Sequence, residues 1–158
     1  MAITLQTFSS DIQRFTNRLV RCQGVSDRVL TEQLGVTVAQ SYTLLAMPPT
    51  DSLTMNELSE TLSLANSTMT RTVDQLVEKG LVERELDDED RRVVRVRLSA
   101  QGQKAQAAVK EVLENFFKQA LSDIPEEERE AVLHSFQTVT RAIAKGLATC
   151  CGQPIPGK

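Results

Sequence analysis

The cysteines are the side chains with the most obvious chemistry in this sequence. Cys22, Cys150 and Cys151 carry thiols, which as thiolates bind soft metals or metalloids such as arsenite, mercury, cadmium and zinc, or oxidise as a pair. Cys22 also continues an apolar stripe, and Cys150 follows Leu147 by three residues, so either side chain could pack as a small hydrophobe. Thiol-based sensing, packing and incidental exposure are all open at this point.

The other reactive residue types do not form a catalytic pattern. The sequence contains no Ser/His/Asp order, no HExxH and no glycine-rich phosphate loop. His134, the one histidine, falls between apolar positions of the last predicted helix, where we expect a surface or interface residue rather than a zinc ligand. Asp87, Asp88 and Asp90 fit a loop better than an acid/base pair. We therefore expect no enzyme activity, no catalytic residue and no required cofactor.

A second group of side chains suits contacts with DNA. A helix predicted from Asn66 to Lys79 turns one apolar side inward: Met69, Val73, Leu76 and Val77. Its other side is small and polar near its start, as in a helix that enters the major groove, and consists of Ser67, Thr68, Arg71, Gln75 and Glu78. The DNA contacts predicted on this helix are Asn66, Ser67, Thr68, Thr70, Arg71 and Gln75. Arg71 could pair with guanine, and the hydroxyls could meet bases or phosphates. The alternative is a solvated helix face that carries one arginine.

The residues that follow predict a β-hairpin in the position of a wing. Apolar and basic residues alternate at 94–98, which is the period of a half-buried strand, and 81–86 make a partner strand. The loop between them ends in Asp90-Arg91-Arg92, whose guanidinium groups could enter a narrow minor groove. Arg84, Asp90, Arg91 and Arg92 are therefore predicted DNA contacts.

Charge alone gives this interpretation no support. The formal net charge is −3, whereas DNA-binding domains are usually basic. From Asn66 to Leu98 the sequence has seven Lys or Arg residues and eight Asp or Glu residues, so the electrostatic affinity for DNA should be modest. The acidic residues 87–89 would repel phosphate unless they point back into the protein or pair with Arg84 and Arg92.

Two further predicted helices precede the Asn66 helix and would position it together with the hairpin. One is predicted from Val38 to Met47, because Thr37 and Gln40 can form a capping box at its start and two prolines end it. A short helix at 54–62 and a tight connection then lead into the Asn66 helix, which indicates a helix-turn-helix. Gly80 stands where a glycine ends the second helix of such a pair.

Long amphipathic stretches flank this centre. Apolar residues recur at steps of three and four from Leu5 to Cys22, and Gln23-Gly24-Val25-Ser26 predicts a break before a shorter piece closed by Gly35. A long helix opens at Ser99, and Ile124-Pro125 separates it from a last helix. The expected fold is mainly α with a small β-hairpin.

We expect a helical dimerisation region at 1–35 and 99–150, a winged helix-turn-helix at 36–98 and a flexible tail at 152–158. At 158 residues one domain is the expectation. No stretch approaches 18 consecutive apolar residues, and no basic and then apolar leader opens the sequence. We therefore expect a cytoplasmic protein with reduced thiols and no membrane partner.

The order of elements and the residues themselves resemble the MarR family of winged helix-turn-helix transcriptional regulators. The resemblance covers roughly residues 35 to 105. It is carried by positions 37–40, 67–71, 73–76 and 79–84 and, most specifically, by Asp90-Arg91-Arg92 followed by Val96-Arg97-Leu98-Ser99 and Gly102. The flanking helices fit by position and periodicity only.

The resemblance implies a homodimer in which the first and the last two helices interlace. Each subunit would place a recognition helix in the major groove and a wing in the minor groove of a pseudo-palindromic double-stranded operator, with repression as the default. In the family's wing motif the aspartate braces the arginine, which here implies Asp90 and Arg92. The alternative is a winged helix that binds another protein and has lost DNA binding, as the near-neutral charge would allow.

The resemblance also implies control by an effector. Family members commonly release DNA when they bind a small phenolic or lipophilic molecule, and some respond to oxidants or metals. The interlaced dimer would bring the region of Cys22 close to that of Cys150 and Cys151. A thiol-binding metal or metalloid is therefore a second candidate effector.

Overall fold

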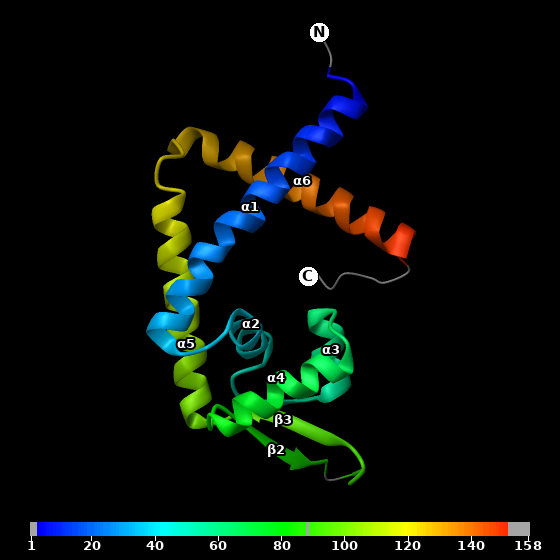
Figure 1. The fold of residues 1–158 in the computed structure, drawn as a ribbon, viewed down its shortest axis with the longest axis vertical. Coiled ribbons are helices and arrows are strands. Elements are labelled where there is room, and N and C mark those ends of the chain that lie inside the picture. The colour runs from blue at the N-terminus through cyan, green and yellow to red at the C-terminus, as the bar shows by residue number, and fades with distance from the viewer. Residues whose placement is uncertain (1–2, 88, 152–158) are drawn as a thin grey trace.

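The computed structural model describes residues 3–87 and 89–151, apart from the side chains at 22–29, 148, 150 and 151. The fold is mostly helical with a small three-stranded antiparallel sheet, which confirms the expected class (Figure 1). The predicted tail at 152–158 lies outside the described residues. The elements are α1 (Leu5–Leu34), α2 (Val38–Ala46), β1 (Ser52–Thr54), α3 (Met55–Leu62), α4 (Asn66–Glu78), β2 (Val82–Leu86), β3 (Val94–Leu98), α5 (Ala100–Ala120) and α6 (Glu126–Cys151).

The first helix is longer than the sequence predicted. The predicted break at Gln23-Gly24-Val25-Ser26 is wrong, because α1 continues to Leu34. A glycine inside a helix costs only about 1 kcal/mol relative to alanine and keeps its amide donor, unlike proline, so a long helix tolerates it. The predicted closure is confirmed: Gly35 is left-handed at φ 64°, and its N–H donates to the carbonyl of Thr31.

Side-chain caps define where the short helices begin. Thr37 and Gln40 form the predicted capping box at the start of α2. Thr54 and Glu57 form a second one at the start of α3, and the N–H of Thr54 lowers the pKa of Glu57. Gly80, at φ 68°, ends α4 as predicted.

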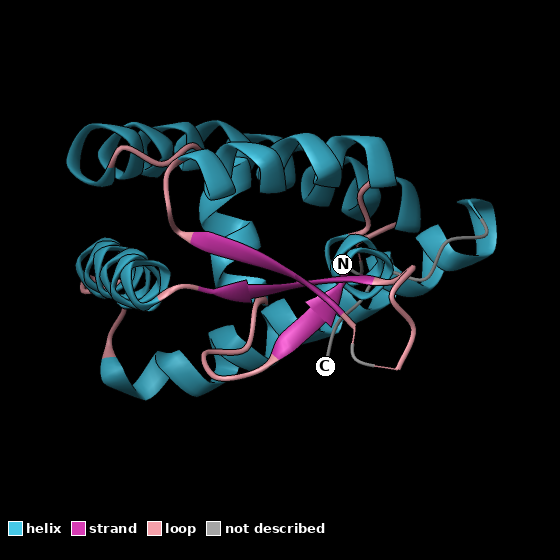
Figure 2. Cartoon of the chain, turned by 90° about the horizontal axis from the view of Figure 1, so that it is seen from below, coloured by secondary structure: helices cyan, strands magenta, loops and turns pink. Residues whose placement is uncertain are grey.

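The hairpin belongs to a three-stranded sheet. The predicted strands pair as β2 and β3, with Val82 opposite Leu98 and Leu86 opposite Val94. β1 adds to the other edge of β3, with Leu53 opposite Val96, and gives the order β1-β3-β2 (Figure 2). The sequence pattern does not predict β1, because a strand of three residues is too short to show alternation.

The start of α5 is fixed to the start of β2 by a very close contact. The carbonyl of Leu81 accepts from the N–H of Ser99 at 3.0 Å. The Ser99 hydroxyl donates to the carbonyl of Gly80 at 2.6 Å and accepts from the N–H of Gly102 at 2.9 Å. A Cβ atom on Gly102 would lie 1.9 Å from the Leu81 carbonyl oxygen, so only glycine fits here.

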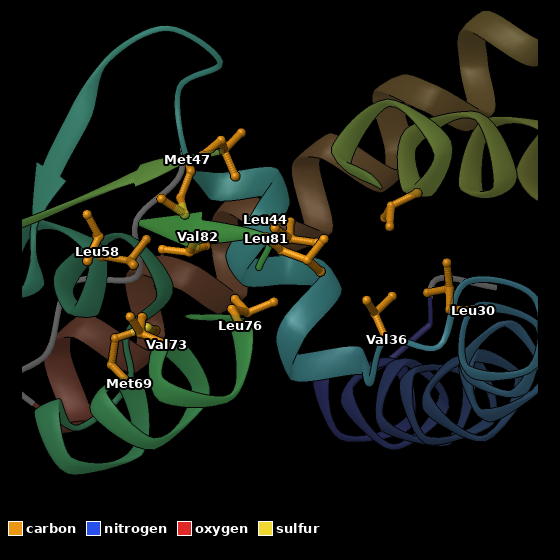
Figure 3. Packing of buried hydrophobic residues seen from close by; sticks show 13 residues of the cluster. Leu30, Val36, Leu44, Met47, Leu58, Met69, Val73, Leu76, Leu81 and Val82 are labelled. Carbon is orange, nitrogen blue, oxygen red and sulfur yellow. The ribbon is translucent and has the colours of Figure 1, made fainter. Parts of the chain in front are cut away.

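The buried core lies in the winged-helix half of the molecule. Among the described buried hydrophobic residues, only Leu30 of α1 and Val109 of α5 lie outside positions 36–98. Figure 3 shows Leu58, Met69 and Val73 packed together, with Val82 and Leu44 beside them. Figure 1 shows α5 leading away from this core to the far end of the molecule, where α6 lies.

Replacing Gly102 with alanine should lower the free energy of unfolding by about 3 kcal/mol, because the new methyl group would overlap backbone rather than a movable side chain. Chemical denaturation at a fixed protein concentration measures this change. The control is Gly146→Ala in α6, where the methyl group meets nothing within 4 Å and replaces a helical glycine. Equal effects of the two substitutions would contradict the close contact.

Candidate nucleic-acid interface

The two sides of α4 are as predicted. Met69, Val73 and Leu76 are fully buried, whereas the predicted contact residues of the outer side are exposed: Asn66, Ser67, Thr68, Thr70, Arg71 and Gln75. Three of these side chains, Asn66, Thr70 and Gln75, already have partners within the chain. The Asn66 amide donates to Asn56 at 3.2 Å, and the Thr70 hydroxyl donates to the carbonyl of Asn66 at 2.8 Å.

The start of α4 differs from the starts of the neighbouring helices. α1, α2, α3 and α5 each begin at a Thr or Ser whose side chain accepts from a backbone N–H of the first turn. α4 follows Ala65 and has no side-chain cap. Its first backbone N–H groups are therefore left to water or a ligand, and the positive end of the helix dipole favours an anion such as phosphate.

The far end of α4 is held by a polar network that the sequence analysis missed. Nε2 of the buried Gln40 side chain donates to the side-chain oxygen Oε1 of Gln75 at 3.0 Å, and Oε1 of Gln40 accepts from the Lys79 ammonium at 2.7 Å. Lys79 also donates to the carbonyl of Gly35 at 2.6 Å. Gln75, a predicted DNA contact, therefore also has a structural role. These bonds tie α4 to the end of α1 and to the start of α2.

The basic residues on the strands of the sheet all form ion pairs. Arg84, a predicted DNA contact, pairs with Asp74 of α4 at 2.7 Å. Arg97 pairs with Glu83 at 2.9 Å and with Glu85 at 3.4 Å. By contrast, the exposed arginines that α4 and the wing contribute form no ion pair with any described residue: Arg71, Arg91 and Arg92.

The wing loop is organised by two aspartates. Asp87 pairs with Arg95, and its other oxygen accepts from the N–H groups of Glu89 at 2.9 Å and Asp90 at 3.0 Å. These bonds, that of Arg95 above all, lower the pKa of Asp87 to about 2. Asp90 in turn accepts from the backbone N–H of Arg92 at 3.0 Å.

Of the two alternatives predicted for the acidic run, Asp87 fits the first, because its side chain points back into the protein, but the predicted partners are wrong. Its partner is Arg95 rather than Arg84 or Arg92, because Arg95 stands on β3 close to the base of the loop whereas Arg84 is engaged with Asp74. Asp88 lies outside the described residues. Glu89 is exposed at the loop.

The predicted thiol cluster falls on side chains that lie outside the described part of the structure. Cys22 lies within α1, and Cys150 and Cys151 are the last residues of α6. Among the described residues no group of His, Cys, Asp or Glu side chains is arranged to hold a metal ion. His134 is exposed on α6, as expected of a surface residue.

A hollow of about 550 Å³ lies along α1. Its lining consists of polar or charged side chains: Ser10, Gln13, Arg14, Asn17, Arg18 and Arg21. None of the described helices combines the length and the apolar character needed to cross a membrane.

The fold and these residues define a winged helix-turn-helix protein, and comparisons with known proteins show which family it resembles. Residues 34–93 match the model of the MarR family. The HTH-type transcriptional regulator YdgJ of Bacillus subtilis is 28% identical over 99 residues, which are 63% of this chain and 60% of YdgJ. The chain therefore spans 60% of the length of this curated relative.

Solved structures agree over a larger part of the chain. A mutant MarR from E. coli, complexed with operator DNA, is 25% identical with a TM-score of 0.66, and the match covers 82% of this chain and 95% of that one. The YusO protein of Bacillus subtilis is 26% identical with a TM-score of 0.69, over 89% of this chain and 99% of that one. The chain therefore has a winged-helix fold, and its residues 34–93 are similar to the MarR family.

The Asp87 carboxyl should titrate at about pH 2 in a carbon-detected NMR experiment. Replacing Arg95 with glutamine removes the largest cause of the lowered Asp87 pKa. This pKa should then rise toward 3.8 but stay below it, because two backbone N–H groups still donate to the carboxylate. A lowered folded-state pKa stabilises the protein above pH 3.8, and this contribution is lost as the pH falls through about 2. The stabilities of the two proteins should therefore converge over that interval.

Arg97→Gln provides the control for this titration, because Arg97 pairs with Glu83 and Glu85 instead. It should leave the Asp87 pKa where it is. An Asp87 carboxyl that titrates near 3.8 in the unmodified protein would contradict the pairing.

Proposed function

We propose that this protein is a DNA-binding transcriptional regulator that acts in the cytoplasm as a homodimer. The observation that carries the proposal is the contrast between paired and unpaired cations. The arginines of the sheet are neutralised by carboxylates, whereas Arg71 of α4 and the two arginines of the wing are exposed without an ion pair among the described residues. The near-neutral segment from Asn66 to Leu98 thus presents its unpaired positive charges at two places, on α4 and on the wing.

These two places suit the two grooves of DNA. Side chains near the uncapped start of α4 can reach base edges in the major groove while its backbone N–H groups meet phosphate. Arginines at the tip of a hairpin suit a narrow minor groove, whose negative potential attracts them. The likeness to a MarR protein that was solved with operator DNA supports the same placement.

The exposed apolar residues of the helical end support the homodimer. None of the described side chains of α6 is buried, although a helix of this length is rarely stable without an apolar partner surface. Large apolar side chains are exposed on α1, at the end of α5 and on α6: Phe8, Phe15, Leu19, Phe117, Leu121, Val132, Leu133, Phe136, Ile143 and Leu147. A second copy of the chain would cover these residues.

A homodimer places two recognition helices on one face of the DNA. Its operator would then be pseudo-palindromic, with half-sites about one helical turn apart, roughly 34–36 Å. A dimer bound there would repress transcription by blocking access of polymerase. Release would require an effector that binds the DNA-incompetent state more tightly, by roughly 1 to 3 kcal/mol.

Thiol chemistry is one route to such release. Cys22 within α1 and the Cys150-Cys151 pair at the end of α6 lie in the two helices that a second copy would cover. If a soft metal, a metalloid or an oxidant is the effector, replacing all three cysteines with serine should abolish the release of DNA by that agent. A response that persists without them would favour a small organic effector.

Arg92→Ala should weaken binding to the operator about tenfold, because it removes a contact to the minor groove. Fluorescence anisotropy with a duplex from upstream of the protein's own gene measures this, at two salt concentrations and against a scrambled duplex. Arg141→Ala in α6 is the matched control and should have little effect. Equal, small effects of both substitutions would favour the protein-binding alternative for the winged helix.

Phe136→Asp should raise the dissociation constant of the dimer on the order of 100-fold, because a carboxylate would replace a large apolar side chain in the covered surface. Phe136 is 56% exposed in the single chain, so the substitution should not disturb the fold of the subunit. Sedimentation velocity gives the result. Thr138→Asp, also exposed on α6, is the control and should leave the dimer intact.

A further inference from the structure

We infer that Asp87 is a positioning residue for DNA binding, an acidic side chain whose presence raises the affinity for DNA. The inference rests on the proposed function. It concerns the acidic run that begins at Asp87, which by charge alone should repel phosphate. The described contacts of Asp87 assign it a different role, as the brace of the loop that carries Arg91 and Arg92.

Asp87 closes the wing loop at its base. Its backbone N–H donates to the carbonyl of Val93 at 3.0 Å, which joins the two sides of the loop. One side-chain oxygen accepts from the N–H groups of Glu89 and Asp90 and folds the loop back on itself. Asp90 then accepts from the N–H of Arg92, so the chain of bonds reaches the arginine that the family resemblance places in the minor groove.

The same carboxylate ties the loop to the rest of the winged helix. Its second oxygen accepts from Nε of Arg95, whose guanidinium also donates to the carbonyl of Ser52 at 3.4 Å. Ser52 begins β1, and β1 leads directly into α3 of the helix-turn-helix. The wing loop is therefore fixed relative to the element that positions α4.

The charge of Asp87 is placed where it repels DNA little. Its side chain is 17% exposed and is paired with Arg95, whereas Glu89 two residues later is exposed and forms no ion pair with a described residue. A loop that is already ordered in the free protein loses less conformational entropy when it binds DNA. By ordering the loop, Asp87 should therefore raise the affinity for DNA more than its negative charge, paired with Arg95, lowers it.

Three substitutions separate these effects, because each removes one negative charge from the same loop: Asp87→Ala, Asp87→Asn and Glu89→Gln. Electrostatics alone predicts tighter DNA binding for all three. We expect Asp87→Ala to weaken binding about tenfold and Glu89→Gln to leave it unchanged or strengthen it. Asp87→Asn keeps an oxygen for the two backbone N–H groups and loses the ion pair, so its affinity should lie in between.

The salt dependence of binding distinguishes lost positioning from lost stability. If the wing arginines no longer reach the DNA, the slope of log K against log salt should fall by roughly one to two for Asp87→Ala and stay unchanged for Glu89→Gln. Hydrogen exchange of the Glu89 and Asp90 amides, measured without DNA, should accelerate in Asp87→Ala. Should Asp87→Ala fail to fold, Asp87→Asn carries the same comparison with a smaller expected loss.

The outcomes keep this inference apart from the proposed function. Asp87 variants that bind DNA as tightly as the unmodified protein, with an unchanged salt slope, would overturn the inference and leave the proposed function intact. An unmodified protein that does not distinguish its operator from a scrambled duplex would overturn the proposed function and, with it, the inference.

Discussion

The winged helix depends on one backbone contact, the approach of the first turn of α5 to Leu81. Because Gly102 has no side chain, the helix can lie against the Leu81 carbonyl, and Ser99 then bonds to both Gly80 and Leu81. This single contact joins the end of α4, the start of β2, the end of β3 and the start of α5. α4 and both strands of the wing hairpin therefore share one junction, while the wing loop is held by separate contacts of its own.

The placement of charge explains how a nearly neutral segment can still present unpaired cations at its surface. Carboxylates on α4, β2 and the wing loop neutralise the arginines that stand on the sheet, at Arg84, Arg95 and Arg97. These exposed or half-exposed pairs contribute little to stability. Their larger effect is on position, because they leave Arg71 and the wing arginines as the cations that point outward. Net charge is thus a poor guide to where this segment presents cations.

Apolar surface divides the molecule into two unlike halves. The core of the winged helix is buried within the single chain, whereas the large apolar residues of α6 stay exposed. The polar network of Gln40, Gln75 and Lys79 links the halves, since it ties α4 to the end of α1 and to the start of α2.

The sequence by itself determined the features that depend on neighbouring residues. The capping box of Thr37 and Gln40, the glycine that ends α4 and the buried side of that helix all follow from local geometry and periodicity. The same local reasoning ended α1 too early, because the weak helix propensity of Gly24 is overcome in a long helix. Tertiary structure alone decided that β1 joins the sheet, that Asp87 pairs with Arg95 and that Gln40 meets Lys79. Those contacts depend on strand register and on which elements pack together, and a linear pattern of residue types does not encode either.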